Sequence, residues 1–184
     1  MAIYYAVIGI CWLAFLVAWA VFASVFRGSG SRNYFRRASG FRILFLTVFI
    51  AMQFGGRRAL PAFGRLGNEV AAAGAALCVV GLAFAIWARV VLGRNWGMPM
   101  TVHANPELVT SGPYSYVRHP IYTGLTAMLI GTSLVNPIAA LPCGLIVAYS
   151  VFSALREERD MEKRFPEAYP EYKKHSKMFV PFLI

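Results

Sequence analysis

Two short segments hold most of the side chains in this chain that can bind a polar ligand. The first, LVTSGPYSYVRHPIYTG, spans residues 108–124 and carries an arginine-histidine pair in front of a proline. The second is the glutamate pair Glu157 and Glu158, which directly follows a long apolar run. Arg118 can hold a carboxylate with two parallel hydrogen bonds, and His119 can donate or accept one. We therefore expect a binding site where the two segments meet.

Other groups of the first segment suit a nucleoside. Tyr114 and Tyr122 can stack on a flat ring or form hydrogen bonds through their hydroxyl groups. The backbone of Leu108, Val109 and Gly112 can pair with polar atoms at the edge of such a ring. The site is thus expected to contact both the charged and the flat parts of its ligand.

Long apolar runs surround these segments and predict an all-α integral membrane protein. Of 184 residues, 58% are hydrophobic and 14% are charged, whereas soluble domains carry about 25% charged residues. Apolar runs of this length cross a bilayer as helices, which satisfy their own backbone groups. We expect about five membrane helices in a single domain covering 1–184, at residues 3–26, 43–54, 70–92, 121–134 and 138–155.

The polar parts of the chain should lie outside these helices. Residues 93–120 form a linker that is too polar and too rich in proline to span a membrane. Asn136-Pro137 should join the last two helices as an antiparallel hairpin, because the connection is short. The tail, residues 156–184, should begin as a charged helix that Pro166 and Pro170 interrupt.

The charge distribution predicts the orientation of the chain in the membrane. The net charge is +10, and a cluster of arginines without acids follows the first helix. Such clusters favour the cytoplasmic side and attract anionic lipid head groups. The linker and the tail should therefore be cytoplasmic and the N-terminus outside. Nucleic acid is not an expected partner, because the sequence holds no motif for it.

Small residues mark one face of the fourth predicted helix. Gly124, Ala127 and Gly131 recur at roughly helical spacing. This face is either a seam that packs against another helix or the wall of a portal open to lipid.

The 108–124 segment resembles the signature of the isoprenylcysteine carboxyl methyltransferase family of integral-membrane enzymes. The resemblance runs from about Leu92 to Leu183 and includes Asn136-Pro137-Ile138 and Arg156-Glu157-Glu158 in the same order. It implies that S-adenosylmethionine binds between the last helical hairpin, the linker and the tail, and that a lipophilic acceptor arrives from the bilayer. The implied cofactor contacts are His103, Leu108, Val109, Tyr114, Arg118, His119, Pro120, Tyr122 and Glu158.

Residue chemistry adds Gly112 and Glu157 to this set, and the catalytic candidates are Arg118, Tyr122 and Glu158. A carboxylate acceptor is already ionised at neutral pH and needs no base. A thiol or amine acceptor needs one, and His119, Tyr122 and Glu158 are the candidates. The other polar groups of the tail have simpler interpretations: Lys173, Lys174 and Lys177 as lipid-facing charge, and Tyr169 and Tyr172 as packing or interfacial aromatics.

Departures from the family pattern concern the acceptor more than the cofactor. The stretch at 96–100 lacks a further histidine, Pro166 replaces a glycine, and 175–178 lacks a Val-Pro pair. The compact chain is more similar to prokaryotic members, so we expect it in the prokaryotic inner membrane. The alternatives are a phospholipid or amine N-methyltransferase and, less favoured because acids open the tail, an NADPH-dependent membrane reductase. The sequence has no metal-site spacing.

Overall fold

The protein is represented by a computed structural model that describes residues 1–25, 67–95 and 107–180. This part of the chain is helical, and its β pairing is one isolated bridge between Val117 and Lys177. The predicted span 43–54 and His103 lie outside the described residues. The elements, in chain order, are α1 (Ala2–Val25), α3 (Asn68–Leu92), η2 (Gly93–Asn95), η3 (Gly112–Ser115), α4 (Pro120–Val135), η4 (Pro137–Ala139), α5 (Ala140–Arg164) and α6 (Ala168–His175).

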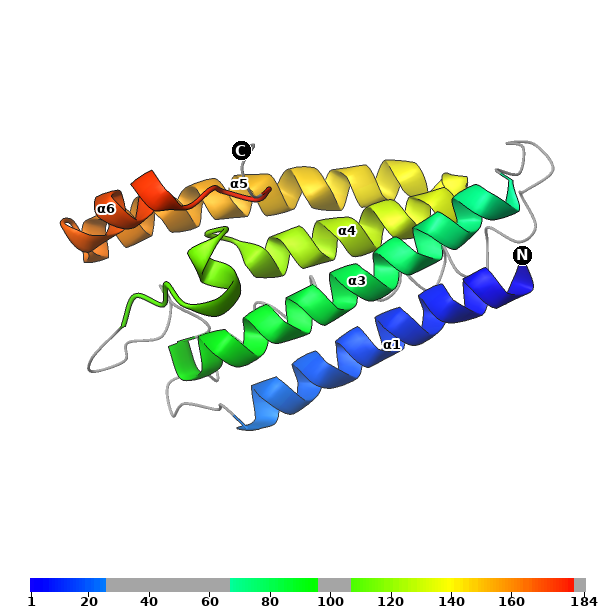
Figure 1. Ribbon diagram of the computed structural model, residues 1–184, viewed down its shortest axis with the longest axis horizontal. Coiled ribbons are helices and arrows are strands. Elements are labelled where there is room, and N and C mark those ends of the chain that lie inside the picture. The colour runs from blue at the N-terminus through cyan, green and yellow to red at the C-terminus, as the bar shows by residue number, and fades with distance from the viewer. Residues whose placement is uncertain (26–66, 96–106, 181–184) are drawn as a thin grey trace.

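The described helices form the bundle of an integral membrane protein. Helices α1, α3 and the η4–α5 segment are long and apolar enough to cross a bilayer, whereas the apolar helix α4 has 16 residues. Helices α1, α3 and α5 run in one direction and α4 runs in the opposite one (Figure 1). The all-α membrane architecture is thus confirmed, and the helix directions are those that five spans require.

A glycine seam, formed by Gly74 and Gly81 of α3 and Gly124 and Gly131 of α4, holds these two helices together. A Cβ added at Gly81 would lie 2.6 Å from the carbonyl oxygen of Gly124, and a Cβ at Gly124 would lie 2.6 Å from that of Gly81. Gly74 and Gly131 approach each other in the same way, about two helical turns away along both helices. Ala127 also faces this seam, 2.9 Å from a Cβ built at Gly81. Of the two interpretations of this face, helix packing is therefore confirmed and the lipid-facing portal is not.

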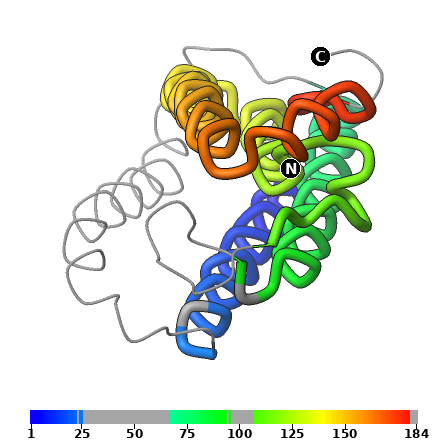
Figure 2. The backbone as a smooth tube through the Cα atoms, turned by 90° about the vertical axis from the view of Figure 1, so that its left-hand side faces the viewer, coloured from blue at the N-terminus to red at the C-terminus, as the bar shows by residue number. Residues whose placement is uncertain are grey.

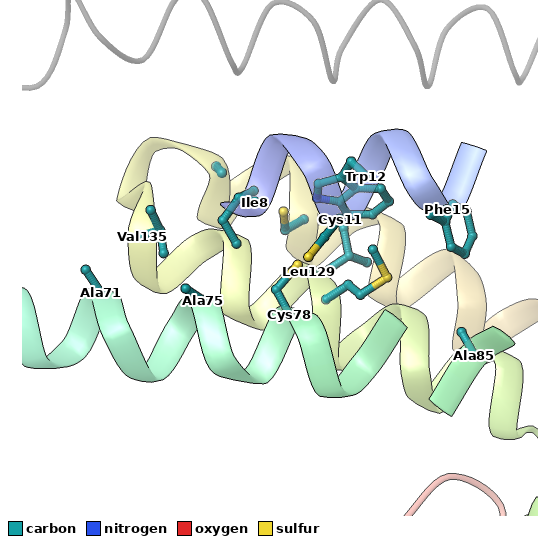
Figure 3. Close-up of a cluster of buried hydrophobic side chains, with 13 residues drawn as sticks. Ile8, Cys11, Trp12, Phe15, Ala71, Ala75, Cys78, Ala85, Leu129 and Val135 are labelled. Atoms are coloured by element: carbon teal, nitrogen blue, oxygen red, sulfur yellow. The ribbon is translucent and has the colours of Figure 1, made fainter. Parts of the chain in front are cut away.

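The buried core lies between α1, α3 and α4 (Figure 3). Trp12 of α1 is 1% exposed and donates a hydrogen bond of 3.0 Å from Nε1 to the hydroxyl of Thr132 on α4. That hydroxyl in turn donates to the carbonyl of Met128, so both polar groups are satisfied at membrane depth. The cysteines of α1, α3 and α5 are buried free thiols.

Local sequence explains where the helices end. Helix α3 stops at Gly93, whose φ of +52° favours glycine. Helix α4 starts with Pro120 in its first turn and ends before Pro137, and the chain then turns through η4 into the predicted antiparallel hairpin.

The tail differs from the sequence-based expectation at one proline. Helix α5 continues without a break past the apolar residues 138–155 to Arg164, so its charged last turns extend beyond the membrane-spanning part. Pro166 lies between α5 and α6, as expected. Pro170 does not interrupt a helix but sits in the first turn of α6. A proline is tolerated there because a first-turn N–H has no partner within the helix.

Candidate active site

An ion pair joins the segment before α4 to the C-terminal part of α5, at the end of the bundle that is expected to face the cytoplasm. Arg118 lies two residues before α4, and its Nε donates a 2.7 Å hydrogen bond to Oε1 of Glu158. The two side chains are only 10% and 9% exposed. A buried charge of this kind persists only when it is paired, so each residue fixes the position of the other.

Glu158 is the centre of a larger cluster. Its Oε1 lies 3.5 Å from Nε2 of His119, and its Oε2 lies 3.1 Å from Nζ of Lys173. Lys173 also contacts Oε1 of Glu162 at 2.9 Å. Burial opposes ionisation of Glu158, but His119, Arg118 and Lys173 outweigh it and lower the pKa of Glu158 to about 2. Glu158 is therefore a permanent carboxylate at neutral pH.

Glu157 has a different environment, although it is the next residue. Its Oε1 accepts a 2.7 Å hydrogen bond from the hydroxyl of Tyr122, and its Oε2 lies 3.6 Å from Nδ1 of His119. Burial raises the pKa of Glu157, against the hydrogen bond from Tyr122 and the charge of His119. The imidazole of His119 thus lies between two glutamates whose acidities are shifted in opposite directions.

The chain after α6 pairs with the segment that leads into α4 (Figure 2) and holds this cluster in place through its backbone. The N–H of Arg118 donates to the carbonyl of Lys177 at 2.7 Å, and the N–H of His119 donates to that of Met178 at 3.1 Å. The N–H of Lys177 returns a 3.1 Å bond to the carbonyl of Tyr116. The Nη1 group of Arg118 also donates to the carbonyl of Ser176. Residues 176–178 therefore run beside residues 116–119, which lead into α4.

The η3 turn connects the site to α3. Gly112 has a φ of +61°, which favours glycine, and a Cβ there would also lie close to Val91 of α3, 3.1 Å from its Cγ2. The carbonyl of Tyr114 accepts a 2.6 Å hydrogen bond from the hydroxyl of Tyr172. Burial raises the pKa of Tyr114, so its phenol is neutral at physiological pH. Burial likewise raises the pKa of Tyr172, to about 12.

The structure brings five of the sequence-predicted site residues into one cluster. These are Arg118, His119, Tyr122, Glu157 and Glu158. Pro120 is buried next to them as the first residue of α4, and Tyr114 and Gly112 shape the adjoining η3 turn. The described contacts of the cluster do not include Leu108 or Val109, which are half-buried in the chain before η3.

Three features of the site region were missed by sequence reasoning. Lys173 is not a lipid-facing charge: it contacts Glu158 and Glu162. The carbonyl of Ser176 could not be read from a side-chain pattern. Arg89 of α3 is fully buried, donates from Nη1 to the carbonyl of Gly93 at 2.8 Å and lies 4.8 Å from the ring centre of Phe22. The sequence alone could have singled out Arg89, because a lone arginine near the end of an apolar helix suggests a functional role.

The cluster has the donors and acceptors of a site for an organic polar ligand. Nε2 of His119 is buried without a hydrogen-bond partner among the described residues, at 3.5 Å from Glu158, which is longer than an ordinary hydrogen bond. A polar ligand atom can satisfy this nitrogen. In the same described part of the chain, no three histidine, cysteine, aspartate or glutamate side chains are grouped to hold a metal ion.

Comparison with protein-family models matches residues 70–168 to the phospholipid methyltransferase family. The match begins in α3 and includes η3, α4, α5 and every member of the Arg118–Glu158 cluster except Lys173. It covers more than half of the chain.

Individual relatives resemble the same half of the chain. The protein-S-isoprenylcysteine O-methyltransferase of Mus musculus is 39% identical over 83 residues, which cover 41% of this chain and 28% of the relative. Its Homo sapiens counterpart is 40% identical over a stretch of the same length and coverage. A cobalt-zinc-cadmium resistance protein of Cupriavidus metallidurans is 32% identical over 96 residues, 50% of this chain and 44% of the relative. The matched stretch is thus less than half of each of these relatives.

Proposed function

Because this chain belongs to the phospholipid methyltransferase family, we propose that it is an enzyme that transfers a methyl group from S-adenosylmethionine to a lipophilic acceptor in the membrane. When bound, S-adenosylmethionine supplies an electrophilic methyl group on a sulfonium. The observation that carries the proposal is the buried cluster of Arg118, His119 and Glu158 between the last helical hairpin and the tail. An in-line displacement needs mainly alignment, and a rigid cluster of this kind aligns its ligand.

The residues of the cluster fit the amino-acid end of this methyl donor. Arg118 would pair with its carboxylate, and Glu158 would attract its ammonium group. The unpartnered Nε2 of His119 would form a hydrogen bond to the same end. Tyr114, Gly112 and the backbone at 108–109 would hold the adenosine, together with His103. Pro120 and Tyr122 would complete the wall on the side of α4.

The acceptor is proposed to be lipophilic and to arrive from the bilayer, because the helices next to the site are membrane helices. The relatives with isoprenylcysteine in their names favour an O-methylated lipid-modified group. The description of the matching family favours a phospholipid amine as the second candidate. A reductase using NADPH is disfavoured, since Glu157, Glu158 and Glu162 would face the nucleotide's phosphates.

The active site is proposed to face the cytoplasm of a prokaryotic inner membrane. The described helix directions put the N-terminus of α1 and the Arg118 cluster at opposite ends of the bundle (Figure 1). Reporter fusions at residue 1 and residue 184 should therefore report opposite sides, with the C-terminal fusion cytoplasmic. Labelling of both ends from one side would overturn this orientation.

Binding of S-adenosylhomocysteine to the detergent-purified protein, measured by calorimetry, tests the proposal. Losing a charge-assisted contact costs about 2–3 kcal/mol, or roughly a hundredfold in affinity. Arg118→Ala should show that loss, and Arg118→Lys should restore it only in part because a lysine lacks the planar fork. Arg159→Ala, which removes an exposed arginine on α5 next to Glu158, is the matched control and should bind normally. Equal binding by the Arg118 variants and wild type would remove this cofactor site.

A further inference from the structure

The face of α5 opposite to its buried residues carries one continuous stripe of exposed side chains. The buried residues of α5 are Cys143, Ser150, Ala154 and Glu158. The stripe recurs every three or four positions, so at 3.6 residues per turn it falls within an arc of about 80°. Its members, in chain order, are Leu141, Leu145, Tyr149, Phe152, Arg156, Arg159 and Lys163. The exposed stripe is therefore separate from the Arg118–Glu158 cluster.

The last three members of the exposed stripe are cations, which together form its basic end. Within the described residues the basic end makes no ion pair. Arg156 instead lies with its guanidinium carbon 5.9 Å from the ring centre of Phe152, one turn earlier. Asp160 and Glu162 border the basic end along the helix, and Glu162 is held by Lys173 at 2.9 Å. Three positive charges thus face the outside of the protein.

The other described helices that are long enough to cross a bilayer lack such an end. The large exposed side chains of α1 are apolar up to Val25, and its last turn has no basic residue. The basic residue in the last turn of α3 is Arg89, which is fully buried. Among these helices, α5 is thus the one whose exposed apolar face continues into cations.

The dimensions of the exposed stripe match one leaflet of a bilayer. From Leu141 to Phe152 the helix rises about 16 Å, and half of a hydrocarbon core is about 15 Å thick. The basic end therefore begins at the level of the lipid head groups. Because Cα–Cβ bonds tilt toward the N-terminus of a helix, its side chains lean back toward the bilayer that α5 leaves. The contact of Arg156 with the ring of Phe152 has this direction.

We propose that the exposed stripe of α5 binds an anionic phospholipid, with an acyl chain along residues 141–152 and the phosphate between Arg156 and Arg159. A guanidinium holds a phosphate with two parallel hydrogen bonds. Lys163 adds a positive charge further out, which favours a head group with a net negative charge over a zwitterionic one. The bound lipid would hold the end of α5, and with it the Arg118–Glu158 cluster, at the membrane surface. This inference does not depend on methyl transfer.

A second copy of this chain fits the exposed stripe less well. In a two-fold dimer whose axis runs along the membrane normal, each stripe would meet its own counterpart. The two basic ends would then lie at the same level, and like charges at contact repel. An anionic lipid supplies the opposite charge in the same place.

Native mass spectrometry of the detergent-purified full-length protein tests the proposal with two added lipids of identical acyl chains. Phosphatidylglycerol should bind about tenfold or more tightly than phosphatidylcholine. Each arginine near an anionic lipid contributes about fivefold, so Arg156→Gln should lower the affinity for phosphatidylglycerol about fivefold and the Arg156→Gln/Arg159→Gln double variant about thirtyfold. Arg156→Lys keeps the charge and should stay within about threefold. Lys174→Gln removes one charge from an exposed pair on α6 and is the matched control.

Hydrogen exchange locates the bound lipid. Backbone amides of residues 152–163 should exchange more slowly in phosphatidylglycerol nanodiscs than in phosphatidylcholine nanodiscs, and the double variant should show no difference between the two. Glycerol 3-phosphate, which has the phosphate without acyl chains, should not slow their exchange. The double variant should bind S-adenosylhomocysteine as wild type does, because the exposed stripe lies opposite to Glu158.

Four results would overturn the proposal. The first is equal affinity of the double variant and wild type for phosphatidylglycerol. The second is an equal loss in Lys174→Gln and Arg156→Gln, which would mean a diffuse response to net charge. The third is protection of residues 152–163 by glycerol 3-phosphate, which would make the ligand a free phosphate. The fourth is a dimer in the mass spectrum that Leu145→Trp dissociates, which would assign the exposed stripe to a second copy of the chain. Each leaves the proposed methyltransferase function intact, because binding of S-adenosylhomocysteine is measured separately.

Discussion

The α3–α4 seam joins α4 to α3, and the Arg118–Glu158 cluster joins the segment that leads into α4 to α5, by opposite means. At the seam, Gly81 and Gly124 bring the two backbones together, and the nearest atom to a Cβ built at either glycine is the carbonyl oxygen of the other. In the cluster, long charged side chains and the tail backbone bridge segments that are distant in sequence, such as Arg118 and Ser176. The seam lies along α3 and α4, and the cluster lies where α4 begins (Figure 1).

The difference separates stability from chemistry. Close backbone packing is the main attraction between helices in lipid, where burial of apolar surface gives little. The seam can therefore stabilise the fold at every pH, whereas the contribution of the cluster depends on the charges of its glutamates. We expect changes at the seam to unfold the protein and changes in the cluster to act on binding and on pH dependence.

The largest effect is expected at the seam, for Gly81→Leu. A Cβ at this position would meet the carbonyl of Gly124 at 2.6 Å and the backbone nitrogen of Met128 at 2.9 Å, and backbone cannot move aside as a side chain can. Overpacking costs about 1–3 kcal/mol and occasionally more, so we expect a loss at the upper end in the free energy of unfolding, measured in detergent. Gly9→Leu on α1 is the control, because nothing lies within 4 Å of its added Cβ. Equal stability of both variants would contradict the seam.

The next effect is the pH dependence of stability that Glu158 creates. Its pKa falls from an ordinary value of 4.5 to about 2 on folding. A lowered carboxyl pKa stabilises the fold above the unfolded value, and this stabilisation is lost as the pH falls from about 4.5 to about 2. The shift corresponds to about 3 kcal/mol. Unfolding measured across that window should show the loss in wild type, and Glu158→Gln should remove most of the dependence.

Glu157 should change stability with pH in the opposite direction in the same experiment. Its pKa is raised, so its ionisation costs stability as the pH rises above about 4.5. Glu157→Gln should therefore be as stable as wild type or more stable at pH 7, whereas Glu158→Gln should be less stable. Destabilisation of equal size by both variants would contradict the assignment of different roles to adjacent glutamates.

Much of this arrangement follows from local sequence. Asn136-Pro137 predicts the hairpin because a proline ends α4 and leaves room for only a short turn. The hairpin in turn places the last part of α5 beside the start of α4, which is why the glutamate pair could be expected to meet the 108–124 segment, although the ion pair of Arg118 and Glu158 was not predicted. The spacing of Gly124 and Gly131 predicts a close face, although only the partner glycines of α3 decide what it faces.

The remainder depends on contacts that side-chain patterns do not encode. The tail meets the site through carbonyl groups of Ser176, Lys177 and Met178, and every residue has a carbonyl. The course of the chain after Pro166 decides which lysine of the tail faces Glu158, and neighbouring lysines look alike in sequence. Pro170 reads as a helix breaker until the start of α6 is known. For these reasons the residue types predicted the charged side of the site, whereas the tail was expected there only from the family resemblance and its contacts were not predicted.

The smallest effect distinguishes two adjacent lysines of the tail. Lys173 contacts the buried Glu158 at 3.1 Å, whereas Lys174 contacts the exposed Glu171 at 2.6 Å. Exposed pairs contribute about 0.2–1 kcal/mol, and many contribute nothing measurable. Lys173→Met should cost about 1 kcal/mol at pH 7 and raise the pH at which the loss of stability is complete, because Glu158 loses a cation and its folded-state pKa rises. Lys174→Met should leave the free energy of unfolding within about 0.5 kcal/mol and leave that pH unchanged. Indistinguishable unfolding curves for the two variants from pH 2 to 7 would mean that Lys173 belongs to the surface and that the cluster ends at Arg118, His119 and the two glutamates.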